Sequence, residues 1–135
     1  MVLIDDQPHC RIEYHPETQC VTQTWKGFAK SSEFRASIEK TIDVFRQYHP
    51  TFILSDTREA DVVDQADAEW VVQHANPILI SQGMTKIAFV LPKKFFARWS
   101  VDHFFRGAKN QPLKAAAFEE PDAAWAWLAE PSPRR

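Results

Sequence analysis

The chain has 135 residues, of which 44% are hydrophobic and 25% charged, as expected for one globular domain with a single core. Its net charge of -2 excludes nucleic-acid binding by phosphate neutralisation over the whole surface. Aromatic residues make up 13% of the chain, so we expect some rings to lie outside the core.

The N-terminus shows neither a secretion signal nor a membrane span. Residues 1–4 are apolar and acidic residues follow, and no apolar run approaches the roughly 20 residues that cross a bilayer. We therefore expect a cytoplasmic protein with no stable membrane insertion. Residues 1–9 are predicted to be an N-terminal segment, 10–130 a single domain and 131–135 a tail.

Alternating patterns predict a β-hairpin over residues 10–25, with its turn at residues 15–18. This turn would place Ile12 opposite Val21. The chain has two cysteines, Cys10 and Cys20. They fall on opposite faces of the hairpin and lack zinc-ligand spacing, so both are predicted to be reduced structural thiols.

A helix is predicted to follow, with a capping signal at Ser31-Ser32-Glu33 and an end at His49-Pro50. Its apolar residues recur at helical spacing, at Phe34, Ile38, Ile42 and Phe45. Residues 51–55 predict a buried strand, with Asp56-Thr57-Arg58 at its C-terminal end.

The second half of the chain continues the alternation of helices and strands. A helix is predicted from Gln65, with a kink or restart at Pro77 and a stop at Gly83. Residues 85–91 predict a strand at the centre of the sheet, and Pro92 ends it.

The last elements are a helical aromatic segment, a short strand and a terminal helix. The aromatic segment covers residues 93–107, where Ser100 is a candidate cap for a second short helix. The strand is expected at 115–118 and the helix from Pro121. The order predicts an α/β fold with a mixed, mostly parallel sheet, an N-terminal hairpin and about four helices.

Several motifs resemble a family of small bacterial STAS-like domains over about residues 10 to 129. The matching runs are Thr24-Trp25-Lys26-Gly27-Phe28, Ser32-Glu33-Phe34-Arg35, Leu54-Ser55-Asp56-Thr57-Arg58, Trp70, Pro77 and Lys86-Ile87-Ala88-Phe89-Val90-Leu91-Pro92. The resemblance implies a fold like that of anti-sigma-factor antagonists and, more distantly, CRAL-TRIO domains. It also implies Thr57 as a regulatory phosphosite, because regulatory members phosphorylate a Ser or Thr just after an Asp at a strand end.

Asp56, Arg58 and Trp70 are the candidate ligand-binding residues. The first two leave a strand end, where open α/β sheets bind ligands. In the alternative interpretation, Arg58 simply locks the loop to Asp56. The sequence contains no nucleophile elbow, glycine-rich phosphate loop or metal-ligand spacing, so we predict no catalytic residues, no metal and no cofactor.

Basic and aromatic residues are mixed between residues 86 and 114. A core position for the rings is one interpretation, and a protein interface is the other. The candidate interface residues are Phe95, Phe96, Trp99, Phe104 and Phe105.

Two hypotheses for function follow. The first is a non-catalytic STAS-like regulatory or protein-interaction module that binds a protein partner or itself as a homodimer. The alternative is a carrier of a small molecule or lipid, apolar or anionic, with a pocket between the sheet and the helices that bear Trp70 and Phe95, Phe96 and Trp99. An enzyme is the least favoured, because no polar groups visibly converge.

Overall fold

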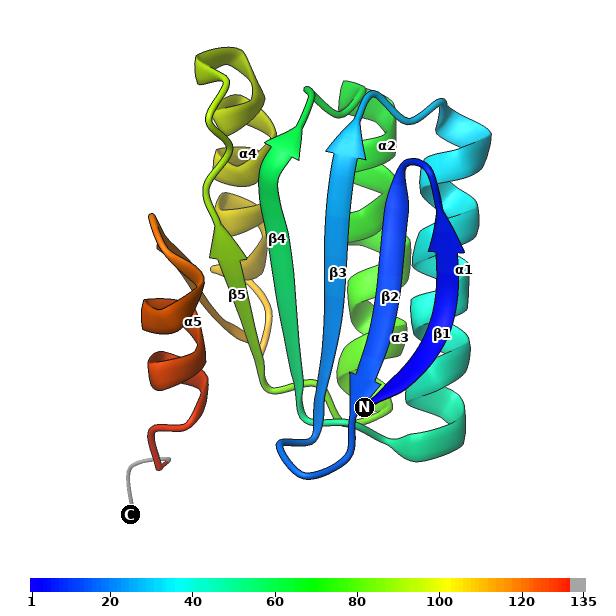
Figure 1. Ribbon diagram of the computed structural model, residues 1–135, viewed down its shortest axis with the longest axis vertical. Helices are drawn as coiled ribbons and strands as arrows, with labels where there is room; N and C mark the ends of the chain where they lie inside the picture. The colour runs from blue at the N-terminus through cyan, green and yellow to red at the C-terminus, as the bar shows by residue number, and fades with distance from the viewer. Residues whose placement is uncertain (132–135) are drawn as a thin grey trace.

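Six strands form one sheet in which neighbours in space are neighbours in sequence (Figure 1). A computed structural model describes residues 1–131. The strands are β1 (Val2–Gln7), β2 (Cys10–His15), β3 (Cys20–Gly27), β4 (Phe52–Ala60), β5 (Lys86–Val90) and β6 (Lys114–Phe118). The first three pair antiparallel, whereas β3 to β6 are parallel. The predicted mixed, mostly parallel sheet with an antiparallel start is confirmed.

Helices cover both faces of this sheet unequally. They are α1 (Ser31–Tyr48), α2 (Gln65–Trp70), the π-helical turn η1 (Val71–Ala75), α3 (Asn76–Ser81), the 3-10 turn η2 (Phe95–Ala97), α4 (Arg98–Ala108) and α5 (Pro121–Leu128). Figure 1 shows α1, α2 and α3 behind the sheet. Helix α4 packs against α2 and η1 on that same side, which we call the helix face. Helix α5 covers part of β4, β5 and β6 on the opposite side, called the α5 face.

Strand alternation divides the apolar residues into two cores, because successive side chains point to opposite faces of a sheet. The larger core lies on the helix face and includes Ile12, Val21 and Ile53. The smaller core lies under α5 and includes Cys20 and Leu54. Strands β3, β4 and β5 contribute to both layers, whereas the buried residues of β2 all belong to the larger core.

Helix α1 follows the prediction closely. The residues of its predicted stripe, Phe34, Ile38, Ile42 and Phe45, are all buried in the larger core. Its N-cap is Lys30, whose backbone N–H donates to Glu33 Oε1 at 2.9 Å. Ser31 does not cap the helix as expected, since its hydroxyl donates instead to the buried Asp67 at 2.6 Å.

The predicted hairpin is present, but the predicted register is wrong. Val21 lies opposite Tyr14, and Ile12 lies opposite Gln23. The turn is centred one residue later than expected, with Gln19 in a left-handed conformation at φ 55°. A shift of two residues keeps every side chain on its predicted face. Cys10 and Cys20 therefore still lie on opposite faces, in different cores.

Four further expectations require correction. The segment 1–9 contains β1, which adds a strand to the hairpin. Strand β4 continues to Ala60, so residues 56–58 lie within it and not after it. Strand β5 is next to the edge strand β6, because the chain adds its strands in sequence order and leaves β3 and β4 central. Ser100 lies inside α4 and does not start a helix.

Pro77 occupies the first turn of α3, where its missing N–H is tolerated, and η1 joins this helix to α2. The predicted restart at this proline is confirmed.

Among the described residues, no helix combines the length and apolar composition needed to span a membrane. A cytoplasmic location remains a prediction. The expected tail falls, apart from residue 131, outside the described residues.

Candidate ligand-binding site

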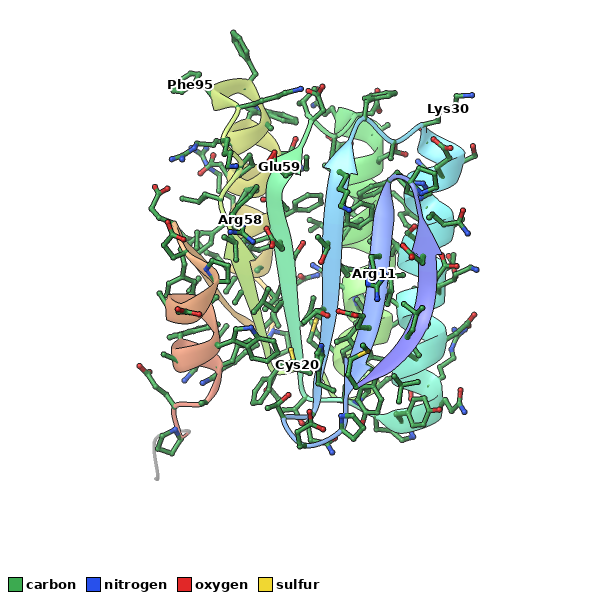
Figure 2. The ribbon with its side chains drawn as sticks, in the orientation of Figure 1. Arg11, Cys20, Lys30, Arg58, Glu59 and Phe95 are labelled. Atoms are coloured by element: carbon green, nitrogen blue, oxygen red, sulfur yellow. The ribbon has the colours of Figure 1, made fainter. Side chains whose placement is uncertain are left out.

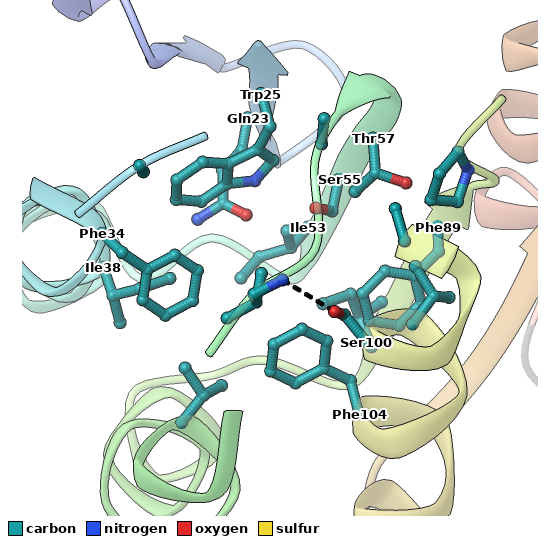
Figure 3. Close-up of a pocket in the computed structure, with 18 of the residues that line it drawn as sticks. Gln23, Trp25, Phe34, Ile38, Ile53, Ser55, Thr57, Phe89, Ser100 and Phe104 are labelled. Carbon is teal, nitrogen blue, oxygen red and sulfur yellow. Dashed lines mark hydrogen bonds between the residues drawn. The ribbon is translucent and has the colours of Figure 1, made fainter. Parts of the chain in front are cut away.

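A cavity of about 80 Å³ lies between the helix face of the sheet and the helices that cover it (Figure 3). The sheet contributes side chains from β3, β4 and β5, and the opposite wall comes from α1, η1, α3 and α4. Most of the lining is apolar, and its larger side chains are Trp25, Phe34, Ile38, Ile53, Leu79, Phe89, Val101 and Phe104. The space is thus a hollow within the larger core.

The cavity extends toward the carboxyl ends of the parallel strands. Gly27 ends β3 and Ala29 follows it, Asp61 to Val63 follow β4, and Pro92 follows β5. Val62 is both exposed and part of the lining, so the cavity meets the surface here. This edge is where open α/β sheets usually bind ligands. We call these residues the mouth.

Two ion pairs hold the loops around the mouth. Lys94 Nζ lies 2.9 Å from Asp61 Oδ2, and Lys93 Nζ lies 2.6 Å from Glu59 Oε1. The hydrogen bond from Lys94 lowers the pKa of Asp61, and the hydrogen bond from Lys93 lowers the pKa of Glu59. Both pairs are exposed, so they position the loops without contributing much stability.

The far wall is closed by a close approach of α4 to η1. A Cβ on Gly107 would come within 2.6 Å of the methyl carbons of Val72, so only glycine fits without a shift. Gln111 Nε2 donates to the Val72 carbonyl at 2.8 Å, and Gln111 Oε1 accepts from Asn76 Nδ2 at 3.2 Å. A π-helical turn changes the backbone hydrogen-bond pattern, and Gln111 occupies one of its carbonyls.

Two hydroxyls in the lining are already used by the backbone. Thr57 Oγ1 donates to the Val90 carbonyl at 2.5 Å, which ties β4 to β5. Ser100 Oγ accepts from the Val63 N–H at 2.8 Å, which ties the mouth to α4. These side chains are part of the structural frame of the cavity.

Three other polar side chains face the cavity from the sheet. Gln23 is 4% exposed, Trp25 is 7% exposed and Ser55 is 4% exposed, and all three belong to the lining. Within residues 1–131, Gln23 Oε1, Trp25 Nε1 and Ser55 Oγ form no protein hydrogen bond. They are therefore the groups available to a bound molecule.

Exposed aromatic rings lie at the same edge of the sheet as the mouth. Phe95 and Phe96 are each 82% exposed, and Phe28 and Trp99 are also exposed. Figure 2 shows Phe95, the first residue of η2, projecting from the end of the molecule. We call Phe28, Phe95, Phe96 and Trp99 the aromatic rim.

The candidate pair Asp56 and Arg58 lies on the α5 face, away from the cavity. Arg58 donates to Asp56 through Nε at 3.1 Å, through Nη2 at 2.8 Å and through its backbone N–H at 3.2 Å. The side-chain hydrogen bonds to Asp56 raise the pKa of Arg58. The arrangement matches the alternative in which Arg58 locks to Asp56.

Trp70 also lies outside the cavity lining. Its ring stacks on His74 with centroids 5.3 Å apart, and the Arg35 guanidinium lies 5.0 Å from the centroid. Arg35 Nε in turn donates to the buried Asp67 at 2.8 Å. Trp70 is thus part of a clamp between α1 and α2.

The predicted interface residues separate into two groups. Phe95, Phe96 and Trp99 are in the rim, whereas Phe104 lines the cavity and stacks on Phe89 with centroids 6.1 Å apart. Phe105 is partly buried, with Lys109 Nζ 5.9 Å from its ring centroid. The segment therefore serves both the core and the surface.

The remaining predicted site is Thr57. Its hydroxyl points to the helix face, is partly buried and is hydrogen-bonded to β5. A phosphate on Thr57 would break that bond and place charge in an apolar cavity. Among residues 1–131, no three His, Cys, Asp or Glu side chains are grouped closely enough to hold a metal ion.

Sequence reasoning missed Gln23 and Ser55. A usable signal was present, because both are polar residues at positions whose neighbours two residues away are apolar or aromatic, such as Ile53 and Trp25. A polar side chain in the inward phase of a central strand must find a partner or line a cavity.

Comparison with known proteins supports the fold and the family. The SpoIIAA-like family model matches residues 20–129, and among curated proteins no sequence matches the chain. The match indicates a STAS-type module, a class that acts in regulation and interaction. The more distant likeness to CRAL-TRIO domains remains a prediction. With a match over most of its length, the chain belongs to the SpoIIAA-like family.

Proposed function

We propose that this protein is a non-catalytic binding protein that holds a small, mainly apolar molecule between the sheet and its helix layer. The observation that carries the proposal is the cavity of about 80 Å³ in the larger core. Protein interiors are normally packed as densely as organic crystals, so an internal space of this size is unusual.

The energetic cost of the cavity supports a binding role. At about 24 cal/mol per Å³, an enclosed, empty cavity of this volume lowers stability by about 2 kcal/mol, which is an upper value for a cavity that meets the surface at Val62. A bound molecule restores the missing dispersion contacts and apolar burial. Several small residues line the space where larger ones would fill it, including Ala29, Ala60, Ala97 and Ala108.

The size of the space limits the ligand. An engineered cavity of about 150 Å³ accepts benzene, so a benzene-sized ligand needs the cavity to expand modestly. The mouth provides a means of expansion, because it consists of loop residues joined by exposed ion pairs. A long lipid chain would require a larger rearrangement of the helix layer.

Ligand capture and cavity filling test this function together. Native mass spectrometry of freshly purified protein is expected to show a bound small molecule, or to show toluene after its addition. Ala60→Leu places a larger side chain in the cavity and is expected to abolish this binding while raising or maintaining the melting temperature. Ala126→Leu, on the exposed side of α5, is the matched control and is expected to bind normally. Equal binding by both variants would refute the cavity as the site.

A second function, protein interaction, is favoured by the aromatic rim. The two rings of Phe95 and Phe96 at 82% exposure represent apolar surface that monomeric proteins rarely leave open. A protein partner or a second copy of this chain would cover them. Light scattering across micromolar concentrations is expected to show a dimer that Phe95→Ser/Phe96→Ser disrupts. A wild-type chain that stays monomeric would exclude the homodimer.

A further inference from the structure

The polar atoms of the cavity are gathered at one place on the sheet. Gln23 and Ser55 are direct neighbours in the register of β3 and β4, and Trp25 follows Gln23 on the same face of β3. Figure 3 shows the three side chains side by side above the apolar floor of the cavity. We call Gln23, Trp25 and Ser55 the polar trio.

The orientation of the Gln23 amide follows from its neighbours. Thr41 Oγ1 donates its only hydrogen to the Ser37 carbonyl at 3.0 Å. Thr41 must therefore accept from Gln23, whose Nε2 lies 2.9 Å away. This assignment leaves Oε1 of Gln23 as an acceptor without a partner in the part of the chain that the structure describes.

The trio offers both hydrogen-bonding functions within one small area. Trp25 Nε1 can only donate, Gln23 Oε1 can only accept, and Ser55 Oγ can do both. No fully buried side-chain nitrogen or oxygen among residues 1–131 lacks a hydrogen-bond partner, so these three atoms remain accessible to water or to a ligand from the cavity. A ligand that brings one donor and one acceptor would satisfy them.

The charge of the lining also limits which ligands the cavity can bind. Among the residues that line the described cavity, Asp61 is the one with a charged side chain, and its carboxylate is paired with Lys94 at the mouth. A carboxylate or ammonium group brought into the interior would lose its hydration without an opposite charge to replace it. The interior therefore disfavours ionised ligands.

We propose that the cavity selects an uncharged molecule with an apolar body and one hydroxyl or primary amide group, which the polar trio binds. This inference rests on the proposed function and specifies its ligand class. A carbonyl or hydroxyl oxygen of the ligand accepts from Trp25 Nε1, its N–H or O–H donates to Gln23 Oε1, and Ser55 completes the contact. The ring or alkyl body lies among Phe34, Phe89 and Phe104.

Three probes of similar size separate the contributions of the apolar body, the hydrogen-bonding groups and the charge to ligand binding. Toluene carries only the apolar body, benzamide adds a neutral donor and acceptor, and benzoate replaces the amide with a charge. Binding of each probe to the full chain is measured by titration, with the indole N–H signal of Trp25 followed by NMR. Benzamide is expected to bind at least tenfold more tightly than benzoate and to shift the Trp25 indole signal, whereas toluene binds without a comparable shift.

Two conservative variants test the residues themselves. Trp25→Phe keeps an aromatic ring and removes the donor, and Ser55→Ala removes the hydroxyl. In each variant the ratio of benzamide affinity to toluene affinity is expected to fall about fivefold, because only benzamide uses the lost polar atom. Retained toluene binding shows that the variant is folded and that its cavity is intact.

The outcomes distinguish this inference from the proposed function. If toluene binds and benzamide shows no preference over benzoate, or if the variants weaken both neutral probes equally, the polar trio is not the selecting element and the apolar site remains. If none of the three probes binds, both proposals are refuted.

Discussion

On strand β4, the polar side chains on the two faces of the sheet differ in whether they have hydrogen-bond partners. Asp56 and Arg58, on the α5 face, make three hydrogen bonds to each other. Ser55, on the helix face, is more deeply buried and has no hydrogen-bond partner in residues 1–131. A paired charge is a structural element, whereas a polar group that faces a cavity without a protein partner is available for binding. The comparison shows that the less conspicuous residue is the better candidate for function.

The reactivity of the two cysteines compares the two faces directly, because one cysteine lies on each face. The change expected in this measurement is the largest among the predicted changes. Burial raises the pKa of Cys10 and of Cys20 from 9.0 to about 12. One pKa unit is a tenfold change in ionisation. At pH 8 the thiolate fraction, and with it the reaction with a disulfide reagent, is therefore expected to be about a thousandfold lower than for an exposed thiol. Stopped-flow measurement of thiol release checks this.

The same reaction compares the two cores. If the helix layer moves to admit a ligand, Cys10 should react before Cys20, and ligand should slow that reaction. Equal rates for single Cys10→Ala and Cys20→Ala variants would contradict selective opening of the helix face.

Stability is also expected to fall as pH rises from 9 toward 12, because thiols with a normal pKa ionise in the unfolded chain before those in the folded chain.

Removal of the charged pair has the next largest expected effect. Asp56→Ala leaves the Arg58 guanidinium without its acceptor, and the expected loss is about 1 kcal/mol in the free energy of unfolding, given its partial exposure. Urea denaturation measures this loss. Ligand binding should not change, because the pair lies on the other side of the sheet. A weakened benzamide affinity in Asp56→Ala would show that the two faces are coupled.

The smallest expected effect is a gain in stability at Ser55. Ser55→Val replaces a hydroxyl without a partner by a β-branched apolar side chain that extends into the cavity and suits a strand. Burial of the added carbon groups is expected to raise the free energy of unfolding by about 0.8 kcal/mol, measured by thermal and urea unfolding. A loss of stability of similar size would mean that the hydroxyl has a role in the folded protein that the cavity geometry does not explain.

Some features of the fold could be predicted because they depend on local patterns. The stripe of α1, the restart at Pro77 and the opposite faces of the two cysteines all follow from periodicity and proline chemistry. The hairpin register was wrong because a shift of two residues preserves the facing of every side chain, so the hydrophobic pattern cannot exclude it. Strand β1 was missed because its exposed residues, such as Val2 and Leu3, show little alternation of burial.

The sequence by itself determined the α/β class, the family and a high content of aromatic residues, some of which had to lie outside the core. Tertiary structure alone decided which rings line a cavity and which form the rim, since Phe104 and Phe95 belong to one helical segment and differ only in what packs against them. It also decided that Ser55, and not its neighbour Asp56, faces the hollow. Periodicity along a strand assigns residues to two faces, but whether the space above each face is filled depends on helices that lie far away in the sequence.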